Sequence, residues 1–219
     1  MVATALDYLT MIRAMPPGVV STFDYVSWAE YEALLNALDE QPRYRLSYDN
    51  GRLEVMTVSA EHETPAGLIP HLIMVIADEF GIDFLSLRST TLRKQKKAKG
   101  TDPDDCYYFK DFKKIVGKKR LDLTVDPPPE LAIEIDVTSR SLSKLPIYAA
   151  VGVPEFWRYH RDRMYFYRLT AGAYQEISHS ELFPFLPPEV LLAFLRKGSL
   201  DGALAMAKEF RKWVREHKA

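Results

Sequence analysis

The sequence has very little cysteine, no long apolar run and almost no net charge. Among its 219 residues, the single cysteine, Cys106, excludes an internal disulfide and fits a reducing cytosol. No apolar run approaches the roughly 18 residues needed to span a bilayer, and residues 1–18 lack the apolar core and cleavage site of a signal peptide. We therefore expect a cytoplasmic protein without a membrane segment. The formal net charge of −1 excludes a uniformly basic nucleic-acid binder but leaves room for a local basic patch.

The composition and the order of the elements predict one folded domain. With 47% hydrophobic and 27% charged residues the chain can bury a core, and it contains no repeat, low-complexity tract or dividing linker. The element order indicates an α+β fold with an α/β-type core: a central mixed sheet flanked by helices, with a helical C-terminal extension. We divide the chain into an N-terminal segment (1–24), the domain (25–195) and a C-terminal helix packed on or extending from it (196–219).

Local patterns predict the individual elements. Asn50-Gly51 supplies the positive φ values that a tight primed turn needs in a hairpin over 44–58. Pro70 predicts a kink or a late start in a helix over 59–81. The other expected elements are helices over 27–40, 141–152 and from 187 onward, the last with an apolar stripe at Leu204, Ala207, Phe210 and Val214, and strands in 83–94, 104–116, 130–139 and 154–178.

An acidic pair lies on the predicted strand after the three prolines at 127–129. At a strand's period of two, Glu134 and Asp136 share one face. An acidic pair of this kind either binds a cation or forms ion pairs with Arg or Lys. The opposite face carries the apolar residues Leu131, Ile133, Ile135 and Val137.

A second acidic cluster surrounds Pro103 at the start of the preceding strand. If the two strands are neighbours, one of these aspartates comes close to Glu134 and Asp136, and a divalent cation such as Mg²⁺ would neutralise the repulsion. Aspartates beside a proline are commonly turn formers, and we favour that interpretation for Asp102 and Asp105. Asp104 is then the candidate ligand in this cluster.

Lys144 lies on the expected helix after the acidic strand, and Tyr148 follows four residues later, so the two side chains can share a helix face. A lysine beside a metal-bound phosphate can orient the attacking water or offset charge in the transition state. The alternative is a solvated helix residue.

Basic residues are concentrated between positions 88 and 120, where twelve Lys or Arg stand against four Asp, a local balance of +8. They flank the expected metal-binding strand, where a phosphate backbone would lie. The alternative is a solvated hairpin tip. The candidate nucleic-acid-binding residues are Arg93, Lys94, Lys96, Lys97 and Lys99.

This order of motifs resembles the PD-(D/E)XK nuclease superfamily, with Pro103-Asp104 as the PD element and Glu134 as the acidic residue of the second element. More closely, the chain is similar to the Uma-two family of restriction-endonuclease-like proteins. The similarity covers roughly residues 25–195 and is carried by "TDPDDCYYF", "PPPELAIEIDVTSRS" and "KLPIYAAVGVPEFWRY". The superfamily's lysine should fall at Asp136, and Lys144 stands where this family's replacement lysine is expected.

The resemblance implies a restriction-endonuclease-like fold and a Mg²⁺-dependent endonuclease, with Mn²⁺ as a substitute, that hydrolyses phosphodiester bonds of DNA. Asp104 and Glu134 would hold the ion, Asp136 would supplement them, Lys144 would assist, and Glu61 would be an accessory acidic residue. Because superfamily enzymes that cut duplexes often dimerise, a homodimer is a further expectation. The alternative, favoured by Asp136 in the lysine position, is a catalytically weak or inactive nuclease-fold protein that binds nucleic acid or a protein partner.

Overall fold

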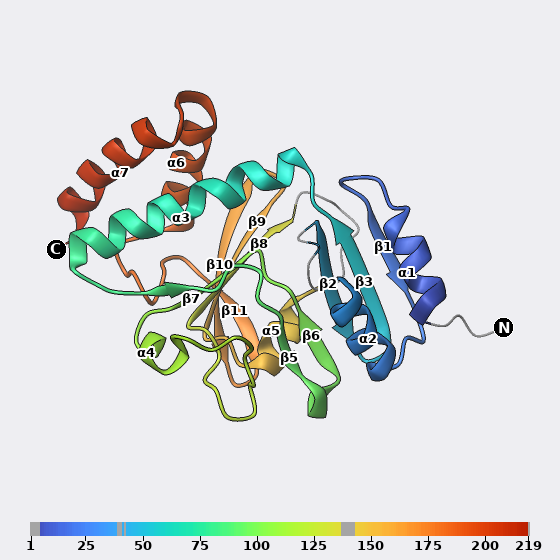
Figure 1. Ribbon diagram of the computed structural model, residues 1–219. Coiled ribbons are helices and arrows are strands. Elements are labelled where there is room, and N and C mark those ends of the chain that lie inside the picture. The colour runs from blue at the N-terminus through green and yellow to red at the C-terminus, as the bar shows by residue number, and fades with distance from the viewer. Residues whose placement is uncertain (1–4, 39–40, 42, 137–142, 219) are drawn as a thin grey trace.

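The computed structural model describes residues 5–38, 41, 43–136 and 143–218 (Figure 1). The predicted α+β class is confirmed, but two sheets replace the single central sheet. The five-stranded sheet has the order β1-β3-β2-β6-β5 and is antiparallel throughout. Its strands are β1 (Val20–Phe23), β2 (Tyr44–Asp49), β3 (Arg52–Thr57), β5 (Leu92–Lys94) and β6 (Lys99–Thr101).

The six-stranded sheet has the order β11-β10-β9-β8-β7-β4 and is mixed, because β8 and β9 run parallel while its other pairs are antiparallel. The chain changes sheets at residues 102–104, between β6 and β7, which is why one central sheet does not form. The strands are β4 (Leu85–Ser86), β7 (Asp105–Tyr108), β8 (Leu131–Asp136), β9 (Glu155–His160), β10 (Arg163–Thr170) and β11 (Ala173–Ile177).

Helices cover the sheets from several sides (Figure 1). The helices α1 (Ala5–Arg13) and α2 (Trp28–Leu38) pack on the five-stranded sheet in one apolar cluster. The long helix α3 (Ala60–Phe80) leads from β3 across the six-stranded sheet, and α6 (Pro188–Asp201) and α7 (Ala203–His217) pack against it. Two short helices are α4 (Phe112–Ile115) and α5 (Leu145–Val151). No helix in the described ranges is long and apolar enough to cross a bilayer.

The predicted hairpin is confirmed by its turn, in which Asn50 and Gly51 have φ values of 48° and 91°. The helix expected over 27–40 is also present. Ser27 and Glu30 cap it reciprocally, since the Glu30 amide donates to the Ser27 hydroxyl at 3.2 Å and the Ser27 amide to the Glu30 carboxylate at 2.7 Å. Residues 39 and 40 of that prediction lie outside the described residues.

The late start expected from Pro70 is wrong. Ser59 caps α3, which runs unbroken through Pro65 and Pro70 to a left-handed Gly81. Tertiary packing compensates for the lost amide, because the buried face of α3 contacts the apolar face of β8. The contacting residues include Leu68, Leu72, Ile76, Leu131, Ile133 and Ile135, while Val137 lies outside the described residues.

Three further expectations need correction. The strand expected over 104–116 ends at Tyr108, and Phe112–Ile115 form the helix α4. The strand-like segment 83–94 forms β4 and β5 in different sheets, separated by a turn in which Arg88 has a φ of 51°. In the C-terminal helix, Gly202 separates α6 from α7, and Leu204 of the predicted stripe is 70% exposed. The stripe that packs is Met206, Phe210 and Val214, which recur every four residues, whereas Leu204 lies about 120° from Phe210 around the helix.

The expected boundaries do not coincide with breaks between elements. β1, in the segment 1–24, pairs with β3, and position 195/196 falls inside α6. The division into three segments remains a prediction.

Candidate active site

Asp104 lies beside Glu134 because β7 and β8 are neighbours. Asp105 pairs with Ile133 in antiparallel register, and the Asp104 amide donates to the Ile133 carbonyl at 3.1 Å. The Ile135 amide in turn donates to Asp104 Oδ2 at 2.7 Å. The backbone on both sides of Glu134 thus fixes the Asp104 carboxylate. The expected proximity of these strands, and the burial of Ile133 and Ile135 against α3, are confirmed.

Glu134 is held by two side chains from the start of α5. Lys144 Nζ lies 2.7 Å from Glu134 Oε2, and the Tyr148 hydroxyl donates to Oε1. Lys144 precedes the first helical residue and Tyr148 lies one turn later, so the face they were expected to share is the face turned to β8. The two carboxylates and the lysine of the sequence analysis therefore meet in one place.

Burial and neighbouring charge set the protonation of this group. Burial raises the pKa of Glu134, Lys144 opposes that effect and the Asp104 charge adds to it, and the net pKa is about 7. Burial lowers the pKa of Lys144, but the negative charges of Glu134 and Asp104 outweigh it and the net shift is upward. Lys144 is therefore protonated at neutral pH, whereas Glu134 is poised close to its midpoint.

The sequence analysis missed His62, which is the residue of α3 that faces the site. His62 Nε2 lies 3.0 Å from Asp104 Oδ1, and Arg45 Nε lies 3.7 Å from the same oxygen. Burial lowers the pKa of His62 but Asp104 raises it more strongly, and His62 correspondingly holds the pKa of Asp104 down against burial. The predicted accessory residue Glu61 is exposed. The sequence feature that could have identified His62 is its spacing: it lies seven residues, or about two helical turns, before Ile69 and so on the apolar face of α3.

Glu54 of β3 is a second residue that the sequence analysis missed. Its side chain is 2% exposed, and it lines a cavity of about 20 Å³ together with Glu134, Lys144 and Arg158. Its charge also contributes to the raised pKa of Lys144. The cavity has room for about one water molecule. The signal was an acidic residue between Leu53 and Val55 in a strand buried on both faces.

Asp136 is placed in an ion pair. Arg158 donates to its Oδ2, and His160 Nδ1 lies 3.2 Å from that atom. Asp102 and Asp105 also have partners within the fold, although these come from distant segments and not from the turn: the Leu46 amide and Thr91 hydroxyl for Asp102, and Ser86 among others for Asp105. In the described ranges, no three His, Cys, Asp or Glu are arranged to hold a metal ion. Asp136 as a third ligand stays a prediction that these contacts do not support.

Two carboxylates, Asp104 and Glu134, remain as residues that could hold a divalent cation together. Their charges interact unfavourably, because Asp104 raises the pKa of Glu134, and a cation between them would relieve this. Mg²⁺ is commonly bound by one or two carboxylates plus waters and substrate phosphates. The donor set therefore fits Mg²⁺ with few protein ligands.

The predicted basic residues lie on the β5–β6 hairpin at the edge of the five-stranded sheet. Lys96 and Lys97 are exposed at its tip. Arg93 lies 3.5 Å from Glu32, and Lys99 is paired with Asp49. Two of the five candidates thus have acidic partners within the fold.

The fold defined by these two sheets is shared with a solved structure. It is similar to a crystal structure described as "a putative nuclease belonging to DUF820" from Anabaena variabilis ATCC 29413, with a TM-score of 0.50 and 13% identity, over 89% of this chain and 99% of that one. The family model Uma2, described as "Putative restriction endonuclease", matches residues 28–200, and the chain belongs to this family. The resemblance read from the sequence is thereby confirmed. No curated protein matches the chain.

Proposed function

We propose that this protein is a Mg²⁺-dependent endonuclease that hydrolyses phosphodiester bonds of DNA. The observation that supports it is the meeting of Asp104 and Glu134, from neighbouring strands, with Lys144 at 2.7 Å from Glu134. A buried group of this composition is more than folding requires, since buried ionic groups generally cost desolvation energy.

Asp104 and Glu134 would hold the cation in this proposal. When bound, the ion lowers the pKa of a water and polarises a phosphoryl oxygen. Lys144, kept protonated by its acidic neighbours, offsets the negative charge that develops on phosphorus-bound oxygens. His62 and the Ile135 amide fix the orientation of Asp104, and Tyr148 fixes that of Glu134. We propose no catalytic role for Glu61, because its side chain is exposed.

The exposed lysines of the β5–β6 hairpin are the proposed DNA contacts. Lys96 and Lys97 are the strongest candidates, because Arg93 and Lys99 already have acidic partners. If they contact phosphates, DNA affinity falls steeply with salt, and the Lys96→Ala/Lys97→Ala variant has a slope shallower by about 2. An unchanged slope would assign these lysines to a solvated tip.

A second candidate function is a catalytically weak or inactive member that binds nucleic acid or a protein partner. The ion pair of Asp136 with Arg158 favours it, because the residue in the superfamily's lysine position is occupied by a structural contact. Binding without turnover would be the outcome that distinguishes it.

The deciding experiment is cleavage of plasmid and single-stranded DNA with Mg²⁺ or Mn²⁺. Asp104→Asn keeps an oxygen for the Ile135 amide and removes the charge, so we expect it to fold and to lose cleavage by more than about 100-fold. Asp201→Asn, with the same change of charge on α6, is the matched control. DNA binding without cleavage by the wild-type protein would establish the alternative.

The compartment and assembly remain proposals. A reducing cytosol suits the buried thiol of Cys106, whose pKa is raised by burial. A homodimer would place two sites on one duplex, and light scattering with and without DNA tests this.

A further inference from the structure

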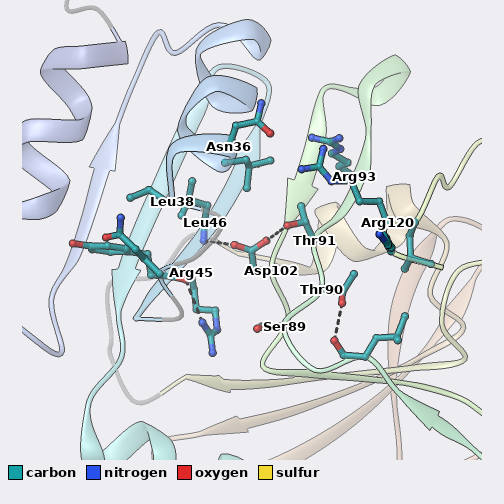
Figure 2. A pocket seen from close by; sticks show the side chains of 16 residues that line it. Asn36, Leu38, Arg45, Leu46, Ser89, Thr90, Thr91, Arg93, Asp102 and Arg120 are labelled. Atoms are coloured by element: carbon teal, nitrogen blue, oxygen red, sulfur yellow. Dashed lines mark hydrogen bonds between the residues drawn. The ribbon is translucent and has the colours of Figure 1, made fainter. Parts of the chain in front are cut away.

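A second and larger cavity adjoins the candidate active site. It has a volume of about 330 Å³ and lies between α2, β2 and the segment around residues 87–91 (Figure 2). Arg45 connects the two places, because it lines this cavity while its Nε lies 3.7 Å from Asp104 Oδ1. A molecule in the cavity would therefore lie next to a proposed metal ligand.

Cations dominate the ionisable residues of this cavity. Arg45, Arg93, Lys119 and Arg120 line it, against the single lining carboxylate of Asp102, and Arg93 also lies 3.5 Å from Glu32 outside the lining. Figure 2 shows Arg93 and Arg120 on the same side of the space. Both oxygens of Asp102 accept hydrogen bonds, from the Leu46 amide at 2.9 Å and the Thr91 hydroxyl at 2.7 Å, so this carboxylate holds the wall together. The lining favours an anion.

The rest of the lining is not that of a simple phosphate site. Five of the sixteen lining residues are leucines, so parts of the wall are apolar and can contact an apolar group of a ligand. Asn36 and Ser89 add polar groups. The leucines are Leu35, Leu38, Leu46, Leu87 and Leu121.

We propose that this cavity, here called the arginine pocket, binds one nucleotide unit. The phosphate would lie against the arginines and Lys119, and the base would lie against the leucine wall. Arginine suits a phosphate because its planar fork can donate two hydrogen bonds at once. The volume of about 330 Å³ falls at the lower end of the range of small-molecule sites, which suits a single nucleotide and not a dinucleotide.

The nucleotide unit has two possible sources, a strand of nucleic acid or a free mononucleotide. The first rests on the proposed function, since the unit would then be next to the phosphate being cut. The second requires no cleavage at all. The chemistry recognised is the same, so the experiment is designed to separate the sources.

The test is calorimetric binding to the intact protein in EDTA, where the proposed cleavage cannot contribute. The probes are 2′-deoxyadenosine 5′-monophosphate, inorganic phosphate and a short single-stranded oligonucleotide. We expect the mononucleotide to bind at least tenfold more tightly than phosphate. Arg93→Ala/Arg120→Ala should weaken it at least tenfold, and Asn36→Trp, an uncharged change at an exposed position on the pocket rim, should do the same by filling the space.

Matched controls keep the result interpretable. Lys208→Ala/Lys212→Ala removes two exposed cations from α7, and Ala33→Trp adds the same bulk to an exposed position of α2 that does not line the pocket; neither should change mononucleotide affinity. Competition by the oligonucleotide would identify a strand as the source, and its absence a free nucleotide. Phosphate binding as tightly as the mononucleotide, or pocket variants that bind like the wild type, would overturn the proposal. Failure to cut DNA would leave it standing.

Discussion

Asp102 and Asp104 flank the same proline, yet they meet different partners. Asp102 accepts hydrogen bonds from the Leu46 amide and the Thr91 hydroxyl, and thereby attaches the turn to the five-stranded sheet. Asp104 accepts one amide, that of Ile135 in the six-stranded sheet, and its other oxygen faces His62 at 3.0 Å. Asp102 is satisfied by neutral donors, while Asp104 lies beside a histidine whose pKa it raises and 3.7 Å from the Arg45 guanidinium.

Three further carboxylates, the half-buried Glu130 and the buried Glu134 and Glu155, show the same contrast. Glu130 accepts the amides of residues 109–111, and Glu155 accepts the amides of residues 181 and 182 and the indole of Trp157. Glu134 is instead met by the ammonium group of Lys144. Carboxylates that fix the backbone need only neutral donors, whereas a carboxylate paired with a side-chain cation can exchange that partner for another cation. A cationic partner alone does not assign a carboxylate to the site, because Asp136 and Glu79 also have arginine partners; Asp104 and Glu134 differ from these in lying buried beside each other.

The largest effect on stability is expected when the candidate active site loses its positively charged side chain, that of Lys144. Lys144→Met leaves Glu134 buried without a positive partner, so the free energy of unfolding should fall by about 3–5 kcal/mol. The double variant Glu134→Gln/Lys144→Met should recover part of that loss, because no buried charge remains. Urea unfolding of the wild type, of the two single variants Lys144→Met and Glu134→Gln, and of the double variant measures this. A loss under about 1 kcal/mol in the single variant would mean that water reaches Glu134.

A smaller effect is expected from Asp102, the aspartate of the fold. Asp102→Ala leaves the buried Leu46 amide without its acceptor and should cost about 1–3 kcal/mol. Asp102→Asn should stay close to wild type, because its oxygen can accept from Leu46 while its amide donates to Thr91. Thermal unfolding compares the two. Equal losses would show that the charge of Asp102, and not its hydrogen bonds, matters to the fold.

The Asp136→Asn variant tests whether Asp136 stabilises the fold or binds a metal ion in the site. Its contacts with Arg158 and His160 predict a loss of about 1–2 kcal/mol that is the same with and without Mg²⁺. A Mg²⁺ site formed by Asp104 and Glu134 would raise the melting temperature of both proteins equally. The measurement is thermal unfolding of each protein across a Mg²⁺ titration. If Mg²⁺ raised the melting temperature of the variant less than that of the wild type, Asp136 would be a metal ligand.

The smallest effect is expected at Glu79, a carboxylate near the surface whose side-chain partners are arginines and a lysine of the C-terminal segment. Hydrogen bonds from Arg215 and Arg211 lower the pKa of Glu79 to about 2 and tie α3 to α7. Because the folded-state pKa is lowered, this stabilisation is present above the unfolded value of about 4.5 and is lost as the pH falls toward 2. Glu79→Gln should lower the melting temperature slightly at pH 7 and flatten its decline in acid. Parallel acid profiles would remove Glu79 from this role.

The elements themselves were largely predictable from local pattern. The period of two in β8, the Asn50-Gly51 turn and the four-residue spacing of Lys144 and Tyr148 each depend on neighbours in sequence, and all three are present in the structure. The prediction for Leu204 failed for a local reason as well, because its spacing from Phe210 places it on another face of α7.

The partners of each carboxylate, in contrast, came from distant segments. His62 and Arg45 reach Asp104 across more than 40 positions, and Arg158 reaches Asp136 across 22. Sequence spacing carries no information about such contacts unless the sheet order is known. This is why Glu54 and His62 were missed, and why Asp136 was expected to bind a metal ion.

By itself, the sequence determined which carboxylates could meet, because Asp104 and Glu134 stand on strands whose periodicity and flanking prolines were readable. Only the tertiary structure decided which of them keep a charge that a ligand can use. That choice depends on whether a backbone amide, a histidine, a lysine or an arginine lies within hydrogen-bonding distance in a buried, weakly screened environment. Such distances are set by the order of the strands and by the change of sheet at residues 102–104.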